Sequence, residues 1–271
     1  MICFPNAKIN IGLNITGKRT DGYHNLETVF YPVSLKDILE FVETKNNKTT
    51  ITVSGTDLKI PDNDNICIKT YNLLKKDYKL PALNIYLHKN IPHGAGLGGG
   101  SSDAAFFLKS LNEYFSLNIE ENKLIDYAVQ LGADCSFFIK NKAVFAEGTG
   151  NLFKDINLSL SGYFIAIVKP DFSISTKEAF QDIIPKTPEI SLKSLIQQPL
   201  ENWKNTIVND FETGIFKKYN FLYKIKQKLY DNGAIYASMS GSGSALYGIF
   251  KDKPGLKKQF SNMFYREKQL D

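Results

Sequence analysis

The chain has 271 residues, of which 43% are hydrophobic and 23% charged, and its formal net charge is +5. This balance is typical of a globular protein and excludes an intrinsically disordered chain. The lysines are scattered, so the charge suits an anionic small molecule and gives no support to a nucleic-acid partner.

The N-terminal sequence MICFPNAKIN lacks the basic and apolar regions of a signal peptide. No apolar run approaches the ~20 residues that a membrane span needs. Three widely spaced cysteines form neither a disulfide framework nor a zinc signature. We therefore expect a cytoplasmic protein without a membrane partner.

The first third of the chain has the pattern of β-strands. Alternating residues predict strands over 7–16 and 25–33, separated by the turn sequence GKRTDGYH. Two apolar stretches, 38–44 and 49–55, flank KNNK and predict a hairpin.

Helices become frequent after residue 60. The periodicity of 64–78 predicts a helix capped by Asp64 or Asn65, and 82–90 predicts a strand. Further helices are expected from Ser101 to near Ser116 and over 119–132, where Gly132 ends the second one.

The remainder of the chain mixes both types of element. It predicts, in order, a strand over 142–151, a strand over 163–170, a short helix over 175–184, a connector over 185–199, a helix over 221–233, two strands around glycines within 234–250 and a final helix over 255–264. A domain boundary is expected within residues 150–162.

The sequence PHGAGLGGGSSDAA, which starts at Pro92, matches two phosphate-binding templates in part. Its glycine spacing fits a dinucleotide-binding fold, but the acidic residues about twenty positions later open a helix instead of ending a strand. It also fits a P-loop, except that Gly100 replaces the lysine. Both templates share one principle: bare backbone amides and a helix N-terminus attract an anion. We therefore predict phosphate binding, against the alternative of a glycine-rich turn without a ligand.

Three stretches together resemble the GHMP kinase family: NAKINIGLNITGKRTDGYHNLETVF, the glycine-rich stretch just described, and SMSGSGSALYGIF. The segment GADCSFF strengthens the resemblance, although relatives usually carry a proline there. The resemblance implies a two-domain α+β fold. Residues 1–155 would form an N-terminal ATP-binding domain like domain 2 of ribosomal protein S5, and residues 156–271 a C-terminal ferredoxin-like domain.

The resemblance also implies the reaction, which is ATP-dependent phosphorylation of a hydroxyl group on a cytidine diphosphate-linked polyol. Phosphoryl transfer needs alignment, charge neutralisation and an acceptor for the hydroxyl proton. Asp134 is the expected acceptor, with Lys8 as the cation beside it in the family's active site. In isolation, Asp134 would be read as a helix cap and Lys8 as a solvated lysine.

The substrate side is expected to use polar and aromatic residues. Asn10 shares a strand face with Lys8 and would bind substrate hydroxyls. Tyr23 offers a flat face to the cytosine and His24 a hydrogen bond to its edge. Phe180 would form the opposite wall, with Thr176 nearby, although a phenylalanine on a short helix is more often part of the core.

The ATP side is expected to comprise Asn65, Ile66, Pro92, His93, Gly94, Ala95, Gly96, Leu97, Gly98, Gly99, Gly100, Ser101 and Ser102. A second bare turn, Gly241, Ser242 and Gly243, would support it, or would simply join two strands. Mg²⁺ should accompany ATP, but no pair of carboxylates marks a metal site held by the protein.

Small molecules are thus the expected partners of a monomer or weak homodimer. The alternatives are another GHMP kinase, such as a homoserine or mevalonate kinase, a nucleotide-binding protein that has lost its activity, and an RNA-binding module. The last lacks the clustered basic residues that RNA binding requires.

Overall fold

The computed structural model describes residues 1–56 and 60–271. These residues form two compact units, each built from separate segments of the chain. The first unit comprises Met1–Ala7, Leu35–His93 and Gly98–Asn141; the second comprises Lys8–Ser34, Gly94–Leu97 and Lys142–Asp271. This grouping does not follow the predicted boundary between residues 155 and 156, which stays a prediction about the domains.

The first unit contains one sheet in the order β1-β4-β6-β5. Its strands are β1 (Ile2–Cys3), β4 (Ile38–Glu43), β5 (Thr50–Ser54) and β6 (Leu83–His88). Strand β6 is antiparallel to β4 and parallel to β5. The predicted hairpin of β4 and β5 is therefore wrong, because β6, with every second residue buried, takes the place between them.

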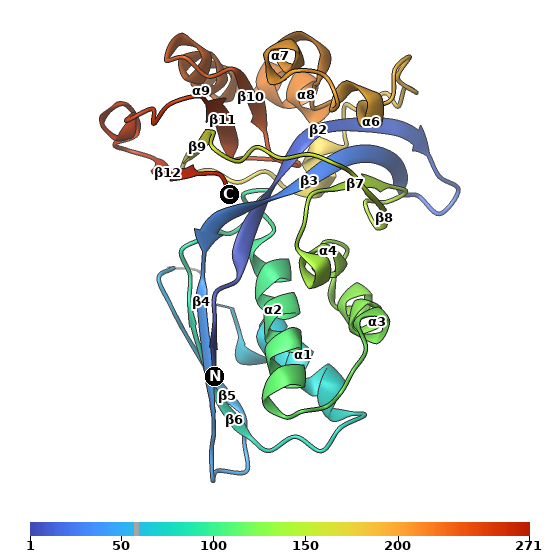
Figure 1. The fold of residues 1–271 in the computed structure, drawn as a ribbon, viewed down its shortest axis with the longest axis vertical. Helices are drawn as coiled ribbons and strands as arrows, with labels where there is room; N and C mark the ends of the chain where they lie inside the picture. Colours follow the sequence, from blue (N-terminus) through green and yellow to red (C-terminus); the bar gives the residue numbers. More distant parts are fainter. Residues whose placement is uncertain (57–59) are drawn as a thin grey trace. The chain divides into compact units, whose positions relative to one another are not determined.

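The helices of this unit lie on one side of the sheet (Figure 1). They are η1 (Asp62–Asp64), α1 (Ile66–Lys75), α2 (Gly99–Tyr114), α3 (Glu121–Leu131) and α4 (Cys135–Lys140), with α3 and α4 beyond α2. Asn65 caps α1 by accepting a hydrogen bond from the Cys67 amide, and α3 ends at Gly132. Both signals were predicted and are confirmed, whereas α4 was not predicted.

The second unit contains two sheets, in the orders β2-β3-β7-β8 and β10-β11-β9-β12. The strands of the first are β2 (Asn6–Lys18), β3 (His24–Lys36), β7 (Val144–Glu147) and β8 (Leu152–Asp155). Those of the second are β9 (Phe164–Lys169), β10 (Tyr236–Met239), β11 (Leu246–Phe250) and β12 (Phe264–Gln269).

The helices of the second unit follow β9 along the chain, and α9 packs on β10 and β11 (Figure 1). They are α5 (Thr176–Ala179), α6 (Leu192–Leu195), η2 (Leu200–Asn202), α7 (Trp203–Thr206), α8 (Phe211–Lys218), α9 (Asn220–Asp231) and η3 (Lys257–Phe260). The predicted final helix over 255–264 is wrong. Only η3 forms there, and the chain then pairs with the edge of β9 as β12, which satisfies the backbone of both strands.

Helices and mostly antiparallel sheets occupy separate layers in each unit, so the predicted α+β class is confirmed. Cys67 and Cys135 are buried, as small apolar side chains usually are. None of the helices in the described part of the chain has the length and apolar character that crossing a membrane requires.

Candidate active site

Strand β2 of the second unit brings Lys8 and Asn10 together. Both are only 3% exposed, and the Lys8 ammonium donates a 2.6 Å hydrogen bond to Asn10 Oδ1. Asn10 Nδ2 donates in turn to Thr28 Oγ1 on β3, at 3.0 Å. The spacing of two residues on a strand explains this meeting, because alternate side chains share a face.

The Lys8 side chain also lies over the ring of Phe30, with Nζ 4.8 Å from the ring centroid. Its backbone amide donates to the carbonyl of Leu97, at 2.9 Å. The cation is thus held on a strand that is hydrogen-bonded to the Gly94–Leu97 segment of the same unit.

We call residues 92–102 the glycine-rich loop. Gly94, Gly96 and Gly98 have positive φ angles of 60°, 73° and 70°, which side-chain-bearing residues rarely adopt. Helix α2 begins at Gly99, two residues before the predicted start at Ser101, with Gly98 at the cap position. Its first amides have no carbonyl one turn earlier to pair with, so they can serve an anion.

Residues 240–244 form a second glycine turn between β10 and β11. It packs backbone against backbone on Gly96, where an added Cβ would lie 1.9 Å from the Ser240 carbonyl oxygen. Ser240 Oγ donates to the Gly96 carbonyl at 2.7 Å, and the Ala245 amide donates to the Ala95 carbonyl at 3.2 Å. The predicted supporting residues Gly241, Ser242 and Gly243 therefore belong to a turn that touches the loop, and the alternative of a plain hairpin turn describes only part of their surroundings.

A buried ionic group lies at the start of α2 in the first unit. The Lys89 ammonium donates to the carboxylates of Asp37 and Asp103, in the latter case at 2.5 Å. Burial and the neighbouring Asp37 outweigh the attraction of Lys89 and raise the pKa of the Asp103 carboxyl to about 8. The two carboxylates in turn outweigh the burial of Lys89 and raise the pKa of its ammonium.

This group is incompletely satisfied. Asp37 accepts hydrogen bonds from the amides of Asn90 and Ile91 as well as from Lys89. By contrast, Asp103 Oδ1 and the neighbouring Ser102 Oγ are buried and have no hydrogen-bond partner among the described residues. The carboxylate with fewer donors is the one expected to carry a proton.

Asp134 lies at the start of α4 in the first unit and is partly exposed. Although it has the N-cap position, its side chain makes no capping hydrogen bond within the described structure. The interpretation of Asp134 as a helix cap is therefore not supported. Its pairing with Lys8, which belongs to the second unit, stays a prediction.

The aromatic residues of the predicted substrate side lie in the second unit. The His24 ring stacks on Phe180, with centroids 4.7 Å apart and planes 18° apart. The Phe180 ring also meets Phe211 edge-on at 4.9 Å, so it belongs to the border of the core as well. Tyr23 is 66% exposed, and Thr176 is exposed at the start of α5.

The predicted adenine-side residues have structural roles of their own. Asn65 is buried and its side chain caps α1, while Ile66 is the first residue of that helix. Pro92 and His93 are assigned to the first unit, directly before Gly94. The contribution of these four residues to ATP binding stays a prediction.

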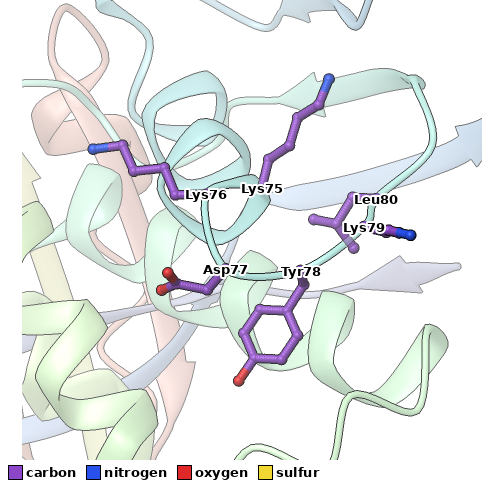
Figure 2. Close-up of a pocket in the computed structure, with 6 residues that line it drawn as sticks. All are labelled: Lys75, Lys76, Asp77, Tyr78, Lys79 and Leu80. Atoms are coloured by element: carbon purple, nitrogen blue, oxygen red, sulfur yellow. The ribbon is translucent and has the colours of Figure 1, made fainter.

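A concave region elsewhere in the first unit follows α1 and has a volume of about 360 Å³ (Figure 2). It is lined by residues 75–80, which include three lysines and none of the predicted site residues. Its lining comes from the end of α1 and the residues that follow, and surface lysines alone do not define a site.

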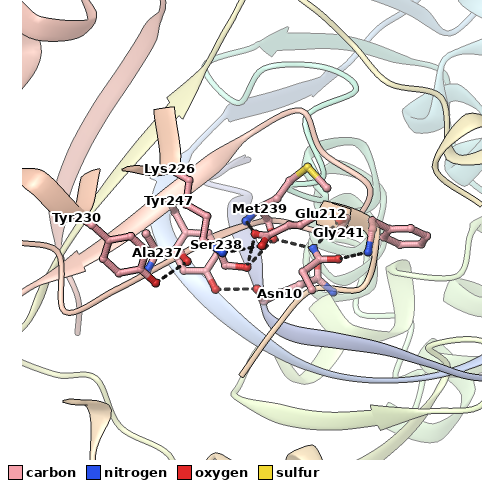
Figure 3. A network of polar contacts seen from close by, with 11 residues as sticks. Asn10, Glu212, Lys226, Tyr230, Ala237, Ser238, Met239, Gly241 and Tyr247 are labelled. Atoms are coloured by element: carbon pink, nitrogen blue, oxygen red, sulfur yellow. Dashed lines mark hydrogen bonds and ion pairs between the residues drawn. The ribbon is translucent and has the colours of Figure 1, made fainter. Parts of the chain in front are cut away.

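Sequence reasoning missed the polar network beneath the second glycine turn, shown in Figure 3. Glu212 accepts hydrogen bonds from Ser238 Oγ and the Met239 amide, and it pairs with Lys226 at 2.5 Å. Asn209 donates to the Met239 and Gly241 carbonyls. The signal was the run of polar residues Asn209, Asp210 and Glu212 around one phenylalanine, which has no ligand-binding pattern by itself.

Comparisons with known proteins agree on one family. Residues 65–142 match the GHMP kinases N terminal domain, and residues 188–266 match the GHMP kinases C terminal domain. The chain is 53% identical over 260 residues to the 4-diphosphocytidyl-2-C-methyl-D-erythritol kinase of Bacteroides fragilis, with 95% of each chain covered.

Solved structures give the same result. A crystal structure of 4-(cytidine 5'-diphospho)-2C-methyl-D-erythritol kinase covers 98% of each chain with a TM-score of 0.83 and 26% identity. The mevalonate kinase of Methanococcus jannaschii covers 100% of this chain and 98% of its own, with a TM-score of 0.71 at 16% identity. The latter likeness concerns the fold alone.

Proposed function

Since this chain belongs to the GHMP kinase family, we propose that it transfers the γ-phosphoryl group of ATP to the 2-hydroxyl of 4-diphosphocytidyl-2-C-methyl-D-erythritol, in the non-mevalonate route to isoprenoid precursors. The observation that carries the proposal is the identity of 53% over 95% of both chains with a relative of that name. The small-molecule partners follow from it. The cytoplasmic location and the state as a monomer or weak homodimer stay predictions.

ATP would bind through the glycine-rich loop. The first amides of α2, at Gly99, Gly100 and Ser101, and the positive end of the helix dipole favour the binding of phosphate oxygens. Mg²⁺ would enter with the nucleotide and neutralise charge on the transferred group. The hydroxyls of Ser101 and Ser102, in the first turn of α2, are the oxygen ligands that this part of the chain offers.

In the transfer, the substrate oxygen bonds to the γ-phosphorus while the bond between that phosphorus and the β–γ bridging oxygen breaks, and ADP leaves. Asp134 would accept or orient the hydroxyl proton. Lys8, held by Asn10 on β2, would supply positive charge to the reacting groups. A loose transition state demands little of a base, so orientation is the larger part of the role assigned to Asp134.

Recognition of the cytidyl group would use the aromatic residues of the second unit. Phe180 presents a ring that already stacks with His24, and Tyr23 has an exposed ring after the turn. Asn10 and Thr176 would bind polar groups of the substrate. Mevalonate and homoserine have no base to stack, so these aromatic side chains favour the cytidyl substrate over those of the related kinases.

The test is ADP release by the purified protein with ATP and Mg²⁺, in parallel with the cytidyl substrate, mevalonate and homoserine. Release with the cytidyl substrate alone supports the proposal. Release with mevalonate or homoserine instead would overturn the substrate, and binding of ATP without release for any of the three would favour a protein that has lost its activity.

Replacing Asp134 tests the catalytic role. Asp134→Ala should lower kcat by about 100-fold or more while changing the Kd for ATP little, because the side chain is assigned to the hydroxyl and not to the nucleotide. Turnover equal to that of the native protein would remove Asp134 from the mechanism.

Replacing Phe180 tests the substrate class. Phe180→Ala should raise KM for the cytidyl substrate by about tenfold, since stacking on a base contributes about 1–3 kcal/mol, and should leave KM for ATP nearly unchanged. An unchanged KM for both substrates would assign Phe180 to the core only.

A further inference from the structure

We propose that Asn209 is a positioning residue of this enzyme, which fixes the second glycine turn and, through it, Asn10 and the Gly94–Leu97 segment. Nothing in the family resemblance assigned a role to this side chain. The inference rests on the proposed function for its consequence in catalysis, but its geometry stands by itself.

Asn209 uses every polar group of its side chain. It is 2% exposed, and Nδ2 donates to the carbonyls of Met239 and Gly241, both at 2.9 Å. Its Oδ1 accepts from the Phe211 amide at 3.0 Å. This arrangement fixes the orientation of the amide, because a flipped group would turn its oxygen toward two carbonyls.

The two carbonyls that Asn209 holds flank Ser240, whose hydroxyl is hydrogen-bonded to the rest of the predicted site. Ser240 Oγ accepts from the backbone N–H of Asn10 at 3.2 Å and donates to the Gly96 carbonyl at 2.7 Å. A shift of this turn therefore moves the hydrogen-bond partners of both Asn10 and Gly96.

The backbone around Asn209 is fixed to the strand that carries Lys8 and Asn10. The Leu13 amide donates to the Val208 carbonyl at 2.9 Å, and the Asp210 amide donates to the Leu13 carbonyl at 2.8 Å. The Asp210 carboxylate also accepts from the Ile15 amide at 2.7 Å. These hydrogen bonds hold Asn209 next to β2, and its side chain in turn holds the second glycine turn.

Glu212 binds the same residue of the turn's entry, Met239, as Asn209 does. It accepts from the Met239 amide at 2.7 Å, while Asn209 holds the Met239 carbonyl (Figure 3). Tyr247 adds a 2.8 Å hydrogen bond from its hydroxyl to the Asn10 carbonyl. Both backbone polar groups of Met239, the last residue of β10, are therefore hydrogen-bonded before the chain enters the turn.

The decisive variant is Asn209→Asp, which keeps the shape and the acceptor for the Phe211 amide but replaces both donors with a carboxylate oxygen. Asn209→Ala removes the donors without adding a charge and serves where the aspartate variant does not fold. The matched control is Asn232→Asp, since Asn232 also donates to a backbone carbonyl of the second unit, that of Lys228 at 2.7 Å, but lies after α9.

Two measurements apply to the folded variants. Steady-state kinetics should show kcat lowered by about 10- to 100-fold, the effect of a displacement near 1 Å, with KM values changed less than about threefold. Hydrogen exchange should be faster in residues 239–245 and 94–97 of the Asn209 variants, and unchanged there in Asn232→Asp.

Native kcat in a folded Asn209 variant would overturn the proposal, and so would exchange rates that rise evenly over the whole chain. Loss of the folded state in both variants, under conditions where Asn232→Asp stays folded, would assign Asn209 to folding alone and also overturn it. If the native protein releases no ADP, the proposed function fails, while the exchange measurement still decides whether Asn209 holds the turn.

Discussion

The second glycine turn and the 98–102 part of the glycine-rich loop have similar sequences, but Gly243 in the first and Gly100 in the second have different surroundings. At Gly243, φ is +89° and an added Cβ would lie 2.6 Å from Met239 Sδ, so the protein itself requires a glycine. At Gly100, φ is ordinary and an added Cβ would meet nothing within 4 Å in the described structure. Gly100 also lies in the predicted phosphate-binding stretch, so we expect this glycine to leave room for a ligand that approaches the backbone there.

The two segments also differ in the balance of the buried charges near them. Near the second turn, one carboxylate, Glu212, meets one ammonium, Lys226, and accepts two further hydrogen bonds. At the start of α2, Lys89 faces both Asp37 and Asp103. The pair of one carboxylate and one ammonium should give a rigid turn. The group of two carboxylates and one ammonium should make the start of α2 sensitive to pH.

The largest effect is expected at Gly96, where the loop meets the second turn. Gly96→Ala should lower the free energy of unfolding by about 3 kcal/mol or more, because the new Cβ clashes with the Ser240 carbonyl and φ is +73°. Urea unfolding measures this loss.

Gly162→Ala is the matched control for Gly96, since Gly162 also has a positive φ, +89°, but an added Cβ has open space in the described structure. It should cost only the backbone strain, about 1–2 kcal/mol. Equal losses of unfolding free energy in the two variants would show that the Ser240 carbonyl does not crowd position 96.

The next largest effect concerns Asp103 and pH. Because its pKa is raised from 3.8 to about 8, the folded protein holds a proton on Asp103 that the unfolded chain has released between these pH values. The contribution of Asp103 to stability should therefore fall as pH rises from about 4 to about 8 and then level off. Asp103→Asn cannot titrate, so the native protein should lose on the order of 2 kcal/mol relative to this variant between about pH 6 and about pH 9.

Thermal or urea unfolding of both proteins at the two pH values measures this difference. Asp62→Asn removes an exposed aspartate of the same unit and should keep the pH dependence of the native protein. Parallel pH profiles for Asp103→Asn and the native protein would mean that Asp103 is ionised in the folded state, and the contrast between the two ionic groups would be lost.

Much of the fold could be predicted because its signals are local. Periodicity and caps identified α1, α2 and α3, since a helix satisfies its backbone within its own segment. Strand pairing is not local. The sequence around β4 and β5 cannot show that β6, thirty residues later, lies between them, and the polar strand β12 pairs only because β9 has an open edge.

In the candidate site, too, local patterns could be predicted and contacts between distant segments could not. Lys8 and Asn10 could be placed together from their spacing on one strand, and the glycine-rich loop from its composition. Asn209 could not be predicted, because its role depends on carbonyls thirty residues away. The stacking of His24 on Phe180, 156 residues apart, likewise depends on tertiary structure that no local pattern encodes.

The smallest predicted change is at Gly100. It best distinguishes a glycine required by a ligand from one required by packing within the protein. Gly100→Ala should raise the stability of the unliganded protein by up to about 1 kcal/mol, since alanine favours the helix, and yet weaken ATP binding by about tenfold, because the methyl group takes space next to the phosphates. Gly17, which also has an ordinary φ and open space around it in the described structure, supplies the control, and Gly17→Ala should leave the Kd for ATP unchanged. Calorimetric titration with ATP and urea unfolding measure the two quantities. Native affinity in Gly100→Ala would mean that the ligand does not approach this backbone, and the contrast between Gly100 and Gly243 would no longer point to a ligand.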